Sequence, residues 1–205
     1  MKNSIKLILI IFTLSVNFQN SNSQTNILRE HISADNGFSS NLIYCIKQDS
    51  KGYIWFGTMY GLVRYDGTEY KTYRFDPLDS NSLSNDDVIS VIEDNDENLW
   101  IGTYNGGLNK FDRRTGQFTR YLFDENNSNS ISNNTIWTIF QDSKNVIWTG
   151  TENGLNRLDE TSGKFISYKK DSLKNGSISG NDIRCIAEDK EGNLWIGTVY
   201  EGLNK

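Results

Sequence analysis

One motif occurs four times along this chain, and the repetition constrains the fold more than any other feature. Each copy has Asp six residues before a Trp, and Gly-Thr two and three residues after that Trp. A Gly-Leu pair closes each copy. The four tryptophans are separated by 45, 48 and 47 residues: Trp55, Trp100, Trp148 and Trp195. A period of about 40 to 50 residues indicates a repeat architecture in which each copy is one structural unit.

The residues between these motifs predict short β-strands. No segment shows sustained helical periodicity. In the second copy, β-branched and aromatic runs separated by turn residues occupy 88–93, 99–103, 108–111 and 117–123. Four-stranded antiparallel sheets repeated at this period are propeller blades. We therefore expect an all-β fold, an incomplete ring of about three and a half blades. The blades are assigned to residues 42–75, 88–123, 135–169 and 182–205.

The repeated Asp, Trp and Gly residues are interpreted as structural. The Asp accepts backbone amides in an Asx turn, and the position three residues later favours positive φ. That position holds Gly52, Glu97, Asn145 or Gly192, and Glu97 is expected to be strained there. A buried Trp anchors each blade against its neighbour. The structural set is Asp49, Trp55, Gly57, Asp94, Trp100, Gly102, Asp142, Trp148, Gly150, Asp189, Trp195 and Gly197.

The first residues have the pattern of a secretion signal. Lys2 and Lys6 precede an apolar run from Leu7 to Val16, and small polar residues follow it. As a helix this run would extend about 15 Å, half the thickness of a bilayer core of about 30 Å. We therefore predict a signal peptide at residues 1–23 rather than a membrane anchor, and an exported chain of residues 24–205.

Composition and charge argue against several classes of function. The net charge of −5 at pH 7 does not provide the positive surface that nucleic acids require. With one His and two Cys, no metal site and no cofactor is predicted. Cys45 and Cys185 each lie ten residues before a Trp, in the first and fourth copies. A disulfide needs Cα atoms within about 7 Å, and these two cysteines lie three blades apart. Both occupy a small-residue position on the innermost strand, so both are predicted to be free, buried thiols.

Catalysis is not expected either. Glycoside hydrolysis needs two converging carboxylates, whereas the repeated aspartates are turn residues of separate blades. His31 precedes the first copy and has no partner for a catalytic dyad. The acidic run 94–98 lacks the twelfth-position Glu of a calcium-binding loop and is interpreted as a hairpin turn. No catalytic residue is assigned.

The copies around Trp55 and Trp195 read DSKGYIWFGTMYGLVRYDG and EDKEGNLWIGTVYEGLNK, and they resemble the two-component regulator propeller repeat. The resemblance covers about residues 27 to 205. It implies the periplasmic sensor region of a hybrid two-component histidine kinase, with polysaccharide fragments as typical inputs. It also implies a dimeric full-length protein anchored in the inner membrane, with a kinase downstream.

Propellers of this kind usually have seven blades, which at about 47 residues each would need about 330 residues. The chain is therefore expected to be the N-terminal part of such a ring. Residues 27–32 have no repeat upstream and are predicted to supply the outer strand of the last blade. An unclosed arc exposes strand edges and an apolar face, so on its own it is expected to oligomerise or aggregate.

Ligand-binding candidates lie where the copies differ, because variable positions on a repeated scaffold can carry a specific site. These places are the turns between second and third strands, the loops between blades (76–87, 124–134 and 171–181), and the residue eleven positions before each Trp. Aromatic side chains beside Arg would suit an acidic sugar. The candidates are Tyr44, Tyr60, Tyr104, Asn105, Trp137, Glu152, Asn153, Arg184, Tyr200 and Glu201.

The sequence thus favours a periplasmic ligand-sensing propeller that binds an oligosaccharide or another small molecule. The alternative is a secreted glycan-binding or adhesion propeller without a kinase. That alternative predicts the same residues 1–205, and the two differ only in the domains that lie downstream.

Overall fold

Short antiparallel strands make up the computed structural model of this chain, which describes Ser33, Phe38 and residues 40–205. Within these residues there is no helix, and so none that could cross a bilayer. The predicted signal peptide at 1–23 and the predicted strand at 27–32 lie outside the described residues.

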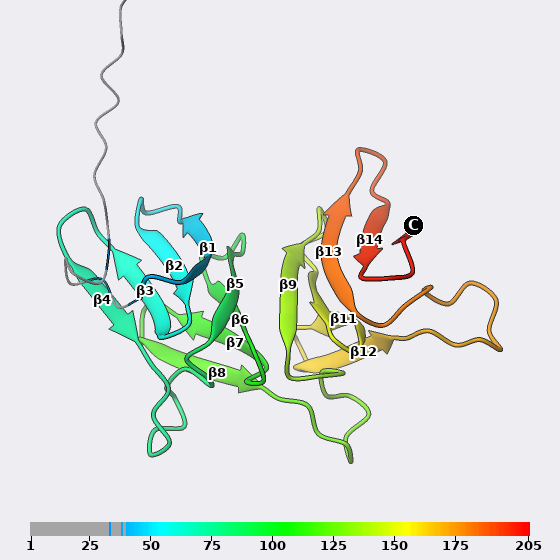
Figure 1. Cartoon of the computed structure of the whole chain (residues 1–205), viewed down its shortest axis with the longest axis horizontal. Coiled ribbons are helices and arrows are strands. Elements are labelled where there is room, and N and C mark those ends of the chain that lie inside the picture. Colours follow the sequence, from blue (N-terminus) through cyan, green and yellow to red (C-terminus); the bar gives the residue numbers. More distant parts are fainter. Residues whose placement is uncertain (1–32, 34–37, 39) are drawn as a thin grey trace, which may run out of the picture. The chain divides into compact units, whose positions relative to one another are not determined.

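The strands form four antiparallel sheets that follow one another along the chain (Figure 1). Sheet 1 contains β1 (Ile43–Gln48), β2 (Ile54–Thr58), β3 (Gly61–Tyr65) and β4 (Tyr70–Tyr73). Sheet 2 contains β5 (Val88–Glu93), β6 (Leu99–Thr103), β7 (Leu108–Asp112) and β8 (Gln117–Tyr121). Sheet 3 contains β9 (Ile136–Gln141), β10 (Ile147–Thr151), β11 (Gly154–Asp159) and β12 (Lys164–Tyr168). Sheet 4 contains β13 (Ile183–Glu188), β14 (Leu194–Thr198) and β15 (Leu203–Asn204).

The predicted all-β architecture of four-stranded antiparallel blades is confirmed. Each sheet is a meander in which consecutive strands pair, with four strands in sheets 1 to 3 and three in sheet 4. The first strands of successive sheets, β1, β5, β9 and β13, contact one another in that order. The first strand of each sheet is therefore the innermost one, as in a propeller.

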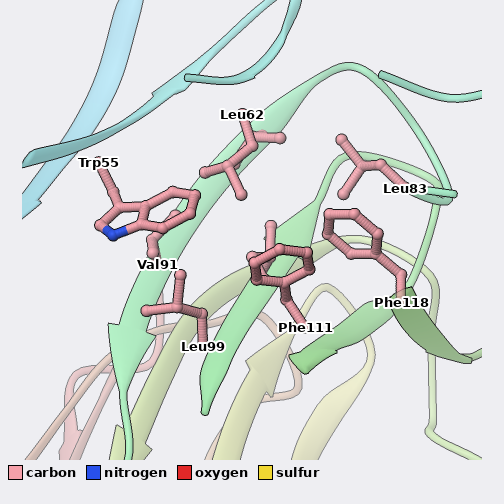
Figure 2. Packing of buried hydrophobic residues seen from close by; sticks show 9 residues of the cluster. Trp55, Leu62, Leu83, Val91, Leu99, Phe111 and Phe118 are labelled. Atoms are coloured by element: carbon pink, nitrogen blue, oxygen red, sulfur yellow. The ribbon is translucent and has the colours of Figure 1, made fainter. Parts of the chain in front are cut away.

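Neighbouring sheets are joined by apolar clusters that contain the repeated tryptophans. Figure 2 shows Trp55 of sheet 1 beside Leu99, with Phe111 of the same cluster on sheet 2. Trp100 of sheet 2 belongs to the corresponding cluster with Ile147 and Phe165 of sheet 3. Burying about 200 Å² of a Trp side chain contributes on the order of 5 kcal/mol. The Trp of one sheet is thus a principal contact with the next sheet.

The turn between the first two strands is built around the repeated Asp. In sheet 2, Oδ1 of Asp94 accepts hydrogen bonds from the backbone N–H groups of Asp96 and Asn98, at 3.0 and 2.8 Å. The residue three positions after the Asp has a positive φ in all four sheets, including 64° at Glu97. The turn therefore imposes the left-handed conformation on a side chain that rarely adopts it, as the sequence led us to expect.

The prediction of two buried thiols is wrong for one of them. Both cysteines are free, but Cys45 is half-buried and Cys185 is exposed. Cys45 packs against the cluster between sheets 1 and 2, and burial raises the pKa of its thiol to about 11. Cys185 has the same place on β13, but no described residues form a further sheet over it.

Candidate ligand-binding face

The residue eleven positions before each Trp is the extra residue of a β-bulge. In sheet 3 the ladder skips from Ile136 to Thr138, which leaves Trp137 without a partner on β10. The same position is skipped in sheets 1, 2 and 4, at Tyr44, Ile89 and Arg184. Because a bulge re-aims the side chain of its extra residue, the variable positions share one structural location near the start of the innermost strands.

Three candidate side chains from three successive sheets meet in one stack. The guanidinium carbon of Arg184 lies 3.7 Å from the centroid of the Trp137 ring. On sheet 2, the ring of Tyr104 lies 6.0 Å from the Trp137 ring, with 52° between their planes. A cation over an indole is worth about 0.5 to 2 kcal/mol. We call this group the Tyr104–Trp137–Arg184 stack.

A buried donor of the stack is unpaired among the described residues. Nε1 of Trp137 is buried and has no hydrogen-bond partner among the described residues. Arg184 is held by two hydrogen bonds to the carboxylate of Asp182, at 2.9 and 3.0 Å. One edge of the Arg184 guanidinium is thus paired with the Asp182 carboxylate, while its flat face lies over the indole of Trp137. An acceptor atom on a bound ligand would satisfy the indole N–H.

Two aspartates accompany the bulged residues and were not among the predicted site residues. Asp182 holds Arg184, and Asp87 lies near Tyr44, whose pKa is raised by burial and then by the charge of Asp87. Oδ1 of Asp87 is buried and lacks a hydrogen-bond partner within the described part of the chain. Both aspartates lie thirteen residues before a repeated Trp. That shared spacing is the sequence signal that identifies them.

The turns between second and third strands are held by the Thr of each Gly-Thr pair. In sheet 3, Oγ1 of Thr151 donates to the carbonyl of Gly154 at 2.9 Å and accepts from the N–H of Asn153 at 3.1 Å. In sheet 2, the turn residue Asn105 reaches the next sheet, where its Oδ1 accepts a hydrogen bond from Oγ1 of Thr135 at 3.1 Å. Tyr104 and Asn105 therefore both face sheet 3.

The structure does not bring every candidate to the stack. Among the described residues, neither Tyr60 nor Tyr200 makes a ring contact with it, and Tyr200 is 89% exposed. Glu201 lies 3.9 Å from Lys170 in a surface ion pair, which contributes little. Glu152 lies in the β10–β11 turn of sheet 3, where its backbone N–H donates to the carbonyl of Thr135 at 3.3 Å.

The face offers aromatic planes, a guanidinium and hydrogen-bonding groups, which together can bind and orient a polar ring. Across the described residues, no group of three or more His, Cys, Asp or Glu side chains is placed to hold a metal ion.

Four segments of the chain match the protein family described as two component regulator propeller: residues 37–60, 82–105, 130–153 and 177–200. Each segment begins before the first strand of a sheet and ends in the turn after the second strand. Each therefore contains the bulged residue, the turn Asp, the Trp and the Gly-Thr pair.

Solved structures of extracellular domains are similar to this chain. One is the extracellular domain of BT3049 from B. thetaiotaomicron, which is assigned to a hybrid two component system. It has a TM-score of 0.68 and 27% sequence identity, and the match covers 85% of this chain and 30% of that one. The extracellular domain of BT4673 from the same organism has a TM-score of 0.67 and 28% identity, covering 82% and 21%.

A relative with an assigned activity is Histidine kinase P4 from Formosa agariphila. It is 38% identical over 76 residues, which is 37% of this chain and 5% of the kinase. The chain thus spans no more than 30% of the length of any of these three proteins.

Proposed function

We propose that this chain, which carries four two component regulator propeller repeats, is the ligand-sensing region of a hybrid two-component sensor. Two similar solved structures are extracellular domains, one of them assigned to a hybrid system, and one relative is a histidine kinase. In this proposal the N-terminal signal exports the chain to the periplasm. A membrane anchor and a kinase belong to the parent protein, where phosphoryl transfer takes place.

The proposed ligand is a fragment of a polysaccharide that contains acidic sugars. The observation that carries this proposal is the 3.7 Å contact between Arg184 and Trp137, with Tyr104 beside it. Binding sites for small polar molecules combine aromatic surface with a few placed polar groups. The aromatic faces would cover a sugar ring, and the unpaired indole N–H would donate to a hydroxyl. The edge of the Arg184 guanidinium that does not bond to Asp182 would donate to a uronate.

Ligand binding at the stack would act on the packing between sheets. Tyr104, Trp137 and Arg184 belong to sheets 2, 3 and 4, so one ligand touching all three has an affinity that depends on how these sheets pack. A ligand that prefers one packing shifts the population toward it. In a dimeric parent protein, that shift would reach the kinase across the membrane.

Calorimetry on this chain tests the proposed site, using neutral and uronate-containing oligosaccharides. Trp137→Ala and Arg184→Gln are expected to weaken binding of the acidic oligosaccharide at least tenfold. Tyr60→Ser changes a turn tyrosine outside the stack and is expected to leave binding unchanged. Wild-type affinity in both stack variants would rule out the stack as the binding site.

The sensor role is tested on the parent protein in isolated membranes. Ligand-dependent phosphorylation that disappears with Trp137→Ala is the expected result. Recovery of the parent as a secreted protein that binds the same oligosaccharide would instead indicate a glycan-binding or adhesion propeller.

A further inference from the structure

A cavity of about 280 Å³ lies between sheets 1 and 2, and it shares no residue with the Tyr104–Trp137–Arg184 stack. Its walls combine cationic and aromatic side chains, although the chain as a whole has a net charge of −5. The cationic residues are Lys51, Arg64, Lys71 and Arg113, and the aromatic residues include Tyr53 and Tyr73. A concentration of positive charge in an acidic chain is a local feature and does not follow from composition.

Two of these cations are neutralised by carboxylates. Nη1 of Arg113 lies 3.1 Å from Oδ2 of Asp49, and its Nη2 lies 2.6 Å from Oε1 of Glu93. Lys51 lies 3.0 Å from the carboxylate of Glu97 in a half-exposed ion pair. These three carboxylates are therefore already engaged, and among the described residues none of them forms an ion pair with the remaining two cations.

The other two cations, Arg64 and Lys71, lack comparable partners. Nε of Arg64 is buried without a hydrogen-bond partner in the described part of the chain. The carboxylate of Asp66 is 3.9 Å from Nη2 of Arg64, and its other oxygen is held by the adjoining turn. Lys71 lies opposite Arg64 in the β3–β4 ladder and makes no ion pair with any described residue. Its ammonium lies 5.0 Å from the centroid of the Tyr73 ring.

The equivalent groove between sheets 2 and 3 has the opposite arrangement. Lys110 lies opposite Trp100, as Arg64 lies opposite Trp55. Glu160 follows the last residue of β11, as Arg113 follows the last residue of β7. Lys110 and Glu160 form an ion pair at 2.8 Å.

Two further wall positions also differ between the grooves. Opposite Lys110 stands the neutral Thr119, whereas Lys71 stands opposite Arg64. Four residues after the turn Asp, sheet 2 has Asn98 where sheet 1 has Tyr53. The repeat therefore supplies a neutral, self-paired groove between sheets 2 and 3. Between sheets 1 and 2 it supplies a groove in which Arg64 and Lys71 have no close carboxylate partner among the described residues.

We infer that the cavity between sheets 1 and 2 binds an oxyanion, namely the sulfate, phosphate or carboxylate group of a small ligand. Nε of Arg64 is buried, and a buried donor without a partner is costly. The exposed ammonium of Lys71, opposite Arg64, adds a charge that attracts an anion. A guanidinium presents several N–H donors in a plane, which matches the geometry of such anions. Tyr53 and Tyr73 provide flat surface for a ring attached to the anion. The inference does not rest on the proposed sensor function, since it concerns other residues.

An NMR titration of this chain with sodium sulfate, with chloride keeping the ionic strength constant, tests the inference. The indole N–H of Trp55, which lines the cavity, is expected to shift with saturation, and that of Trp100 is expected not to shift. Arg64→Gln and Lys71→Thr are each expected to weaken sulfate binding at least tenfold. Arg64→Lys, which keeps the charge, should retain most of the affinity.

Lys110→Gln is the matched control, because it removes a cation from the neighbouring groove. It is expected to leave sulfate affinity unchanged. The inference is overturned by the absence of a saturable shift at Trp55, by equal shifts at Trp55 and Trp100, or by wild-type affinity in Lys71→Thr. Lys71 is exposed, so that variant is expected to fold even if Arg64→Gln does not.

Glucose 6-sulfate and glucose identify the source of the anion. Tighter binding of glucose 6-sulfate than of sulfate supports a ring-bearing ligand held against the tyrosines. Equal binding supports a site for the free ion. Glucose carries no charge, and if it binds as tightly as its sulfate ester the inference fails.

Discussion

Nε1 of Trp100 donates a 2.7 Å hydrogen bond to Oδ2 of Asp94, whose other carboxylate oxygen closes the preceding turn. One carboxylate therefore connects the turn between β5 and β6 to the apolar cluster between sheets 2 and 3. Asp94 is 5% exposed and Trp100 is fully buried, so the bond is shielded from water. The same indole-to-carboxylate bond recurs in the other three sheets, at 2.7 to 2.9 Å. This bond accounts for the fixed spacing of six residues between Asp and Trp.

Asp94→Ala is expected to lower the free energy of unfolding by about 3 kcal/mol, because it leaves the buried indole donor of Trp100 without an acceptor and removes the turn. Urea denaturation followed by far-UV circular dichroism measures the change. The matched control is Asp189→Ala, which removes the same bonds where Trp195 is only half-buried. Its loss should be smaller, and an equal loss would contradict the role given to burial.

The two cysteines are expected to differ in their reaction with iodoacetamide. Cys185 is exposed and should be alkylated in the native protein. Cys45 is half-buried with its pKa raised to about 11 by burial, so it holds little thiolate at pH 8 and should react only after denaturation. Peptide mass spectrometry after timed alkylation distinguishes the two sites. Equal labelling under native conditions would contradict the packing described for β1.

The strands could be predicted from sequence because each is bounded by its own turn residues. The expected segments 88–93 and 99–103 coincide with β5 and β6. The bulges could not be predicted in this way. The bulged position holds Tyr, Ile, Trp or Arg, none of which distinguishes a bulge from an ordinary strand position. The bulge arises from the pairing register of two strands.

Part of the candidate site could be predicted from the repeat. Trp137 and Arg184 were identified because they vary within a repeated frame, and the structure places them in contact. The cationic lining of the cavity between sheets 1 and 2 includes Arg64 and Arg113, which are 49 residues apart in sequence. Sequence periodicity alone does not show which of these side chains face the same cavity.

Stability should fall in acid because of the aspartates in the turns between third and fourth strands. Hydrogen bonds from the backbone of Glu69 and Thr68 lower the pKa of Asp66 from 3.8 to about 2. The pKa values of Asp112 and Asp159 are lowered in the corresponding turns. A carboxyl group whose pKa is lowered by folding stabilises the folded state fully at a pH above the pKa of the unfolded state. This stabilisation is lost as the pH falls through the pKa of the folded state.

The expected loss therefore develops as the pH falls from about 4 toward 2. Urea midpoints measured between pH 6 and pH 2 should fall less in Asp66→Asn than in the wild type, because the amide does not titrate but keeps one acceptor oxygen. Parallel pH profiles for the two proteins would show that Asp66 makes no such contribution.

Gly150 is expected to be irreplaceable because sheet 4 approaches it closely. A Cβ at this position would lie 2.6 Å from Cγ2 of Thr138 in its own sheet. It would also lie 2.7 Å from Cγ2 and 2.8 Å from the carbonyl oxygen of Ile183, the first residue of β13. Backbone cannot yield as a flexible side chain does, so Gly150→Ala should cost about 2 to 3 kcal/mol of unfolding free energy. Gly197 has the same place in sheet 4, where a Cβ would meet only Cys185 among the described residues. Thermal denaturation compares the two Ala variants. If Gly197→Ala lowers the stability as much as Gly150→Ala, the glycine is needed for packing within its own sheet and not for the close approach of the next sheet.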